Sequence, residues 1–283
     1  MQRRGLVLQV LASLFCFFII SNRIKLKEIE FFPGSSDVDN KCSCGEALSG
    51  TQLDAIGGWI LNEETIRKHH VRFDDGLGRE ILRIVREKTP GKEYGERIRL
   101  GDIGAGVGQF GEWINSQENI SVEWTGLDGG SNVNTFCGKN VSLRDQKIFK
   151  VPKVCFFDAS IHAKSEDLVK LGAPFDWVIS IEVGEHIPSQ YQLAYIDNLI
   201  RVSIFDTDNL IRMSKIGIIL SWAVPGQGGQ GHVNEKSNKA VVKLFEDRGL
   251  FYLHKVSDSV RRRVDRLNWL RKTVMVFSKM DGL

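Results

Sequence analysis

The chain has 283 residues, of which 42% are hydrophobic and 26% are charged, so it is long enough to bury one large core or one domain with a tether. Its formal net charge at pH 7 is only +3, which does not require a nucleic-acid partner. No basic face with interleaved aromatic residues indicates an RNA path either, so we expect no nucleic acid among its partners.

Residues 1–22 combine positive charge with a long apolar run. Arg3 and Arg4 precede the run from Leu6 to Ile20, and no cleavage pattern of small residues follows it. This favours an uncleaved signal anchor, a single transmembrane helix, over a cleaved signal peptide that would leave a secreted protein. We therefore expect a single-pass membrane protein of an endomembrane such as the ER or Golgi. Basic residues flank the run on both sides, so its orientation stays open.

Residues 23–55 are predicted to form a stem or linker, because residues 31–51 are rich in Gly, Ser and Asp and have little apolar periodicity. Four cysteines outside the apolar run permit three disulfide pairings if the compartment oxidises: Cys42, Cys44, Cys137 and Cys155. A zinc site formed by the first two of these with His69 and His70 lacks any recognised ligand spacing. We expect no metal site.

Residues 56–283 are predicted to form one domain in which strands and helices alternate. Leu77, Ile81 and Val85 recur at helical spacing, which predicts an amphipathic helix over residues 76–88. Five short apolar runs predict strands over residues 98–104, 121–128, 153–158, 175–183 and 216–223. Further helices are predicted over residues 108–118, 163–172, 188–203 and 237–250. Alternation of this kind predicts a mostly parallel sheet covered on both faces, a doubly wound α/β fold.

The C-terminal part departs from this alternation. Residues 250–260 and 272–279 resemble two strands, and a stretch rich in arginine joins them. Two consecutive strands joined in this way form a hairpin, which places an antiparallel strand in the sheet. The basic residues between them, from Arg261 to Lys272, are interpreted as a solvated hairpin loop.

Residues 102–109, DIGAGVGQ, connect the first predicted strand to a helix, where an open α/β sheet binds its ligand. Glycine leaves room for a ligand and permits the positive φ of a tight turn. A dinucleotide-binding loop has the spacing G-x-G-x-x-G, whereas here Gln109 occupies the last glycine position and Asp102 precedes the first. A carboxylate at this place suits a ligand with an ammonium group better than a pyrophosphate. S-adenosylmethionine is such a ligand.

Acidic residues also end the next two predicted strands. Asp128 is placed to accept hydrogen bonds from both hydroxyls of a ribose, although that acid alone would equally fit NAD. Asp158 is placed to accept from an adenine amino group. Any one of these acids also fits a helix cap or a loop. Three of them at three successive strand ends make coincidence a weaker explanation.

These motifs resemble those of the class I S-adenosylmethionine-dependent methyltransferases, over about Leu77 to Lys279. The resemblance rests on LGDIGAGVGQFGEWI, TGLDGG, FFDAS, FDWVISIEVGEHIP, IGIILSWAVPGQGG and the closing hairpin. It implies a Rossmann-like, seven-stranded sheet with an antiparallel last strand, S-adenosylmethionine as cofactor, and methyl transfer by in-line displacement. The apolar N-terminus together with WAVPGQGGQGHVN is similar to membrane-anchored methyltransferase-like proteins.

The expected cofactor-binding residues lie at the ends of the first four predicted strands: Asp102, Gly104, Ala105, Gly106, Gly108, Asp128, Gly129, Asp158, Ala159 and Glu182. The candidate catalytic residues follow the fourth and fifth strands: Glu185, His186 and His232. Residues 185–188 equally fit a plain turn before a helix. Trp222 is expected to join His232 in a mobile wall over the acceptor, and His69 and His70 are candidates to cap the cofactor.

The expected methyl acceptor is a small molecule, a glycan or a protein side chain. Two alternatives remain. A nicotinamide-dependent oxidoreductase of the same fold class is disfavoured by Gln109 and by the lack of a Tyr-x-x-x-Lys pair in a suitable place. A non-catalytic binding protein that retains the methyltransferase fold is the other.

Overall fold

The computed structural model describes Cys44 and residues 60–89, 96–117, 121–130, 132–200 and 214–279. The predicted anchor over residues 1–22 lies outside these residues, as does the predicted stem apart from Cys44, so the domain boundaries stay predictions. Within the described residues, no helix has the length and apolar character needed to cross a membrane. The predicted single-pass membrane localisation and membrane partner are corrected to that extent: the described residues supply no spanning helix for them.

A seven-stranded sheet with the strand order β5-β2-β1-β6-β7-β9-β8 forms the centre of the fold. Five of its strands run parallel: β1 (Ile98–Ile103), β2 (Val122–Asp128), β5 (Val154–Phe156), β6 (Phe175–Ser180) and β7 (Ser214–Leu220). β9 (Met275–Ser278) pairs antiparallel with both β7 and β8 (Phe251–Tyr252). Every residue of β6 is buried, as expected for a central strand covered on both faces. The predicted Rossmann-like sheet, mostly parallel with an antiparallel strand near its C-terminal end, is confirmed.

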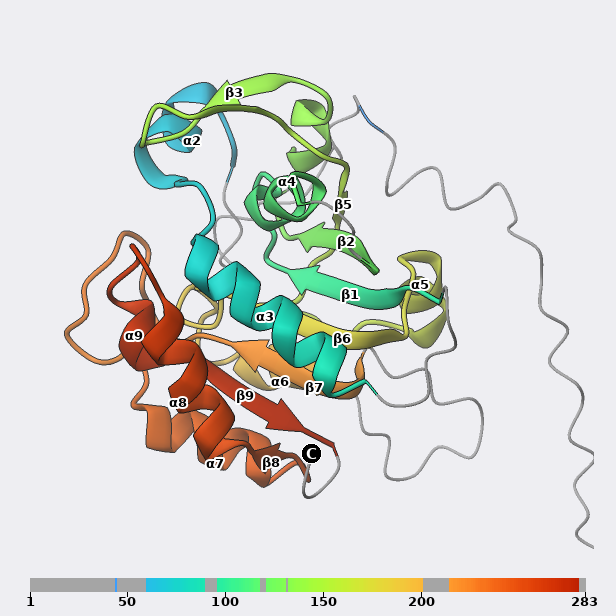
Figure 1. Ribbon diagram of the computed structural model, residues 1–283, viewed down its shortest axis with the longest axis vertical. Coiled ribbons are helices and arrows are strands. Elements are labelled where there is room, and N and C mark those ends of the chain that lie inside the picture. Colours follow the sequence, from blue (N-terminus) through green and yellow to red (C-terminus); the bar gives the residue numbers. More distant parts are fainter. Residues whose placement is uncertain are drawn as a thin grey trace, which may run out of the picture. The chain divides into compact units, whose positions relative to one another are not determined.

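Helices cover both faces of this sheet (Figure 1). One layer contains α3 (Asp75–Glu87), α4 (Gln109–Asn115), α8 (His254–Arg263) and α9 (Leu270–Thr273). Ile81, Trp113 and Val260 of this layer belong to one buried cluster. The other layer contains α5 (Ser165–Lys170), α6 (Gln192–Ile200) and α7 (Asn238–Glu246), whose side chains join a second cluster. The parallel strands therefore end at one edge between two helix layers, where loops are free to form a site.

A smaller cluster lies beside the β2–β5 edge and was not predicted. It comprises α2 (Glu63–His69), the 3-10 helix η3 (Val133–Phe136) and an antiparallel hairpin of β3 (Asn140–Ser142) with β4 (Ile148–Lys150). Cys44 forms a disulfide with Cys137, at a Cα–Cα distance of 5.4 Å. Cys155 is also disulfide-bonded. The Cys44–Cys137 bond selects one of the three disulfide pairings that the sequence allowed. Because Cys44 is in a disulfide, it has no thiolate to offer to the zinc site that the sequence disfavoured.

The C-terminal hairpin differs from its prediction. Within residues 250–260 only β8 is a strand, and α8 begins at His254. Ser257 and Val260 are buried at helical spacing, so one face of α8 packs on α3 although its N-terminal neighbours are typical of a strand. Arg261 is therefore part of a helix and not of a solvated loop; its Nε donates to the Val274 carbonyl at 2.8 Å. The basic residues end the helix, where cations are favourable.

Asp74 joins the start of α3 to the segment between α8 and α9. Its side chain is fully buried. Oδ1 accepts from the amides of Leu77 and Asp265 at 2.9 and 3.0 Å, and Oδ2 from those of Arg266 and Leu267 at 2.6 and 3.0 Å. Burial raises the pKa of Asp74, but the four amides together lower it further, so its pKa lies below the ordinary value. One carboxylate thus caps a helix and holds the distant segment.

Asp74→Asn is expected to lower the free energy of unfolding by about 2 to 4 kcal/mol at pH 7, because the amide nitrogen cannot accept from two buried backbone N–H groups. Urea unfolding of the full chain measures this. Asp247→Asn, which breaks an exposed pair with Lys243, is the control and should change stability by less than about 0.5 kcal/mol.

The effect of Asp74→Asn should also depend on pH. Because the folded-state pKa lies below the ordinary 3.8, the stabilisation is present above that value and is lost as pH falls through the lower, folded pKa. The difference between the two proteins should therefore shrink in strong acid. Equal urea midpoints for both at pH 7 would show that the amides do not depend on this carboxylate.

Candidate functional site

A cavity of about 560 Å³ opens at the carboxyl edge of the parallel strands. It is lined by all but one of the predicted cofactor-binding residues: Asp102, Gly104, Ala105, Gly106, Asp128, Gly129, Asp158, Ala159 and Glu182. Gly108 is the exception. Of the candidate catalytic residues, His186 and His232 line the cavity, whereas Glu185 is fully buried and does not. The fold therefore brings together residues from four strand ends and two later loops.

The glycines of the loop after β1 have left-handed backbones that favour glycine. Their φ values are +80° at Gly104, +58° at Gly106 and +79° at Gly108. A Cβ on Gly104 would lie 2.2 Å from a methyl of Val183, and one on Gly108 would lie 2.4 Å from Cγ of Pro152. Packing against Pro152 accounts for Gly108, so its predicted contact with the ligand has no support from its position.

Asp128 fixes this loop from the end of the neighbouring strand. Its Oδ2 accepts from the amide of Gly106 and its Oδ1 from that of Gly130, both at 2.8 Å. Burial raises the pKa of Asp128, and the two amides oppose the rise only in part. The carboxylate is thus held in place at the cavity wall with its charge incompletely compensated.

Asp102 is the second buried carboxylate of this wall and is only 5% exposed. Burial raises its pKa to about 7; a hydrogen bond from Trp124 Nε1 at 3.1 Å opposes the rise, and the nearby charge of Asp128 adds to it. A cation in the cavity would favour ionised Asp102, and an anion would disfavour it.

Asp158, the third acid, forms hydrogen bonds within its own loop. Its Oδ1 accepts from both the amide and the hydroxyl of Ser160, at 2.9 and 2.6 Å. The plain structural interpretation, a residue that caps its own loop, therefore holds for one oxygen. The residue still lines the cavity, so a ligand contact by this side chain remains a prediction.

The segment that precedes α3 covers the glycine loop. His70 Nδ1 lies 3.0 Å from Nε2 of Gln109, and burial lowers the pKa of His70 to about 4, so this imidazole is neutral at pH 7. His69 and His70 both line the cavity, at the place expected of a cap. Gln109, which the glycine spacing singled out, thus holds the covering segment.

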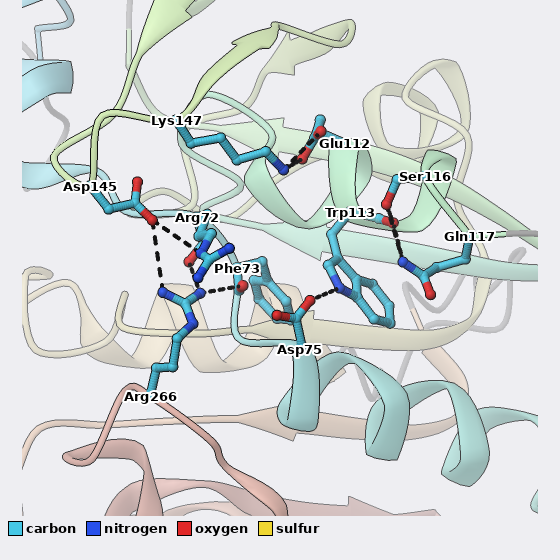
Figure 2. Close-up of polar contacts among 10 residues, drawn as sticks. All are labelled: Arg72, Phe73, Asp75, Glu112, Trp113, Ser116, Gln117, Asp145, Lys147 and Arg266. Atoms are coloured by element: carbon cyan, nitrogen blue, oxygen red, sulfur yellow. Dashed lines mark hydrogen bonds and ion pairs between the residues drawn. The ribbon is translucent and has the colours of Figure 1, made fainter.

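Three separate parts of the fold hold this segment in place (Figure 2). Arg72 pairs with Asp145 of the β3–β4 connection at 3.2 Å. Arg266, from the segment after α8, donates to the Phe73 carbonyl at 2.8 Å. Asp75 accepts from Trp113 Nε1 of α4 at 2.8 Å. The cavity roof is therefore fixed by residues that no local sequence pattern connects.

Glu182 lies where β6 gives way to the next loop and has a left-handed backbone with a φ of +58°. Its amide donates to the Ser221 hydroxyl, which in turn donates to Glu182 Oε1, both at 2.7 Å. Burial raises the pKa of Glu182. A non-glycine residue held at positive φ is strained, and such strain concentrates at functional sites.

His186 and His232 face each other across the cavity wall, with ring centroids 5.0 Å apart and planes at 78°. Burial lowers the pKa of His186 to about 4, despite a hydrogen bond with the Gly231 carbonyl that opposes the fall. His186 is therefore neutral at pH 7 and a weak base. Its expected role in removing a proton loses support for this reason.

Trp222 does not form the predicted wall over an acceptor. It is fully buried, contacts Tyr195 at a ring distance of 5.9 Å and donates its Nε1 hydrogen to the Asn234 carbonyl at 2.6 Å. Gln227 and Trp269 line the cavity instead. Trp269 was missed because it comes from the segment between α8 and α9, which was interpreted as a solvated loop.

Comparisons with known proteins find similarity at the level of structure. A scan of protein-family models and a search of curated proteins both find no match. Magnesium protoporphyrin IX methyltransferase from Synechocystis PCC 6803, solved with bound SAH, is 16% identical at a TM-score of 0.43, over 72% of this chain and 84% of that one. The methyltransferase domain of bacterial CtHen1-CN is 14% identical at 0.41, over 77% and 100%. The [4+2]-cyclase SpnF is 12% identical at 0.41, over 78% and 86%.

Asp102→Asn is expected to stabilise the ligand-free chain at pH 8 and to change its stability little at pH 4. The folded-state pKa of about 7 exceeds the ordinary 3.8, so the unfolded chain releases its proton first, and stability falls as pH rises between the two values. The stabilisation at pH 8 should reach up to about 4 kcal/mol. Chemical unfolding at both pH values measures it; a difference that is the same at both would contradict a perturbed Asp102.

Proposed function

We propose that this chain is an S-adenosylmethionine-dependent methyltransferase, whose cofactor occupies the 560 Å³ cavity beside the glycine loop. The observation that carries the proposal is the pair of buried carboxylates, Asp102 and Asp128, on one wall of this cavity. The cofactor's ammonium and sulfonium groups supply positive charge to that wall. A ligand of this charge stabilises the ionised form of Asp102, which burial otherwise disfavours.

The contacts around Asp128 fit a ribose. Each carboxylate oxygen accepts one backbone amide and retains a lone pair for a hydroxyl donor. Gly104 and Gly106 bring the backbone close to the ligand without a side chain between them. Asp158 and Ala159 then lie beside the adenine.

Methyl transfer from a sulfonium is an in-line displacement, so the protein chiefly aligns the donor with its acceptor and excludes water. The segment around His70 and the aromatic side chain of Trp269 enclose the cavity on the side of the glycine loop and of the C-terminal segment. Glu182, His186 and His232 form the remaining wall, where the acceptor lies. That acceptor is a small molecule, a glycan or a protein side chain.

The nicotinamide-dependent alternative conflicts with the same carboxylates. A dinucleotide would place a pyrophosphate at the glycine loop, close to Asp102. The repulsion between the two negative groups would add to the energetic cost of burying ionised Asp102. A non-catalytic binding protein is compatible with the cofactor site but leaves the strained backbone of Glu182 without a role.

Calorimetric titration of the full chain with S-adenosylmethionine and, separately, with NAD tests the proposal. We expect saturable heat with S-adenosylmethionine alone. Asp128→Ala should weaken that binding by about 1 to 3 kcal/mol, because charge-assisted hydrogen bonds to the ribose are lost. Asp247→Ala is the matched control and should bind as the unchanged chain does. A folded chain that binds neither ligand, or only NAD, would overturn the proposal.

A further inference from the structure

We infer that Glu185, His186 and His232 bind a first-row divalent metal ion, such as Zn²⁺ or Mn²⁺, at the cavity wall where the acceptor lies. The ligand atoms that the three residues offer lie within 4.8 Å of one another. A metal site at these residues was not predicted, since two of them follow β6 and the third follows β7.

The two loops that supply these residues are held together by their backbones. The amides of Val233 and Asn234 both donate to the Glu185 carbonyl at 2.9 Å. Asn234, itself buried, also donates its side-chain amide to the Ile187 carbonyl at 3.0 Å. His232 is therefore placed opposite Glu185 and His186 by contacts that do not involve the three side chains, as a preorganised ligand set requires.

Glu185 is a buried acid whose charge has no adequate partner. The residue is fully buried, and neither of its carboxylate oxygens makes a hydrogen bond. The groups nearest to this carboxyl are the amides of Glu185 itself and of Ala223 and the carboxyl of Glu182, a second acid that disfavours its negative charge. A buried carboxylate left in this way is costly, and a bound cation is one of the few partners that compensates it. The carboxylate points to a ligand that is positively charged.

Each histidine has an acceptor at Nδ1. His186 Nδ1 lies 3.1 Å from the Gly231 carbonyl, and His232 Nδ1 lies 3.2 Å from Oε1 of Glu235. A carbonyl or carboxylate oxygen accepts a proton from Nδ1, so in the neutral imidazole Nε2 carries the lone pair. Orientation of a ligating histidine by a carbonyl or carboxylate at its other nitrogen is the usual arrangement at metal sites.

The donor set selects the metal. Two imidazole nitrogens and one carboxylate are the ligands of open catalytic zinc sites and of other first-row metals, whereas Mg²⁺ and Ca²⁺ prefer oxygen ligands alone. His186 and His232 line the cavity, so a metal held by them is accessible from it. Glu182 lines the same cavity and interacts with both Glu185 and His232, which adds a second negative charge beside the cation.

For the proposed methyl transfer, on which this consequence rests, the metal selects an acceptor that carries a hydroxyl group. A divalent cation lowers the pKa of a hydroxyl that it binds, so the acceptor releases its proton to solvent. The acceptor oxygen then forms the new O–C bond to the methyl group, while the C–S bond breaks and its electron pair remains on sulfur. The products are the methyl ether and S-adenosylhomocysteine.

Metal retention by the full chain tests the site without any assay of methyl transfer. The chain is treated with a chelator, dialysed against ZnCl₂ or MnCl₂ and then against metal-free buffer, and analysed for metal content. We expect about one Zn²⁺ or Mn²⁺ per chain and no retention of Mg²⁺ in the same protocol. Co²⁺ offers a second readout, because protein ligands give it visible absorption bands that differ from those of the hydrated ion.

Variants assign the metal to these residues. Glu185→Gln and His232→Ala should each weaken binding by about 100-fold or more, and Glu235→Gln, which removes the carboxylate that orients His232, by about 10-fold. His254→Ala is the matched control, because His254 is an exposed histidine paired with Asp258, and it should bind metal as the unchanged chain does. Circular dichroism establishes that each variant is folded.

Two results would overturn the inference. The first is an unchanged chain that retains only Mg²⁺ or no metal and gives no change in the Co²⁺ spectrum, a result that needs no variant. Alternatively, folded Glu185→Gln and His232→Ala chains would bind Zn²⁺ and Mn²⁺ as tightly as the unchanged chain. Calorimetry with S-adenosylmethionine is run on the same samples: cofactor binding without metal binding removes the metal site alone, and metal binding without cofactor binding removes the proposed function alone.

Discussion

The burial of two carboxylates beside each other, Asp102 and Asp128, is the constraint around which the cavity is built. Each ends a parallel strand, and the charge of Asp128 contributes to the raised pKa of Asp102. Backbone amides compensate Asp128, and an indole N–H compensates Asp102, but neither compensation offsets burial. Gly106, whose backbone is left-handed, lies close enough for its amide to donate to Asp128. The charge on the cavity wall and the conformation of the glycine loop therefore depend on each other.

Much of this could be predicted from the sequence, because parallel strands carry their own local signals. The apolar runs that end in Asp102, Asp128 and Asp158 located three strand ends, and the parallel arrangement then placed those ends at one edge. The C-terminal part of the fold, from β8 to β9, could not be predicted in the same way. Residues 250–253 are apolar and lead directly into α8, so the sequence shows no boundary between the strand and the helix. The buried face of α8 is defined by its contact with α3, which is distant in the sequence.

The residues that sequence reasoning missed share a physical cause. Trp269 reaches the cavity because the segment after α8 is held by Asp74, and the place of Glu185 opposite His232 depends on two amides that meet one carbonyl oxygen. Loop length alone does not determine such distances. The acid and histidine types at these positions suggested chemistry, but their separation in space decides between a general base and a metal ligand.

The tie at Asp74 has a consequence for how the chain acquires its structure. The contacts from its carboxylate to Asp265 and Leu267 join residues 191 and 193 positions apart. Contacts of such long range raise the contact order of a protein and slow its folding. During synthesis the segment that carries Trp269 follows the glycine loop and the five parallel strands, so these precede that part of the cavity lining in time. The ligand site is therefore completed only once residues 265–269 have been synthesised and Asp74 has bound the amides of Asp265 and Leu267.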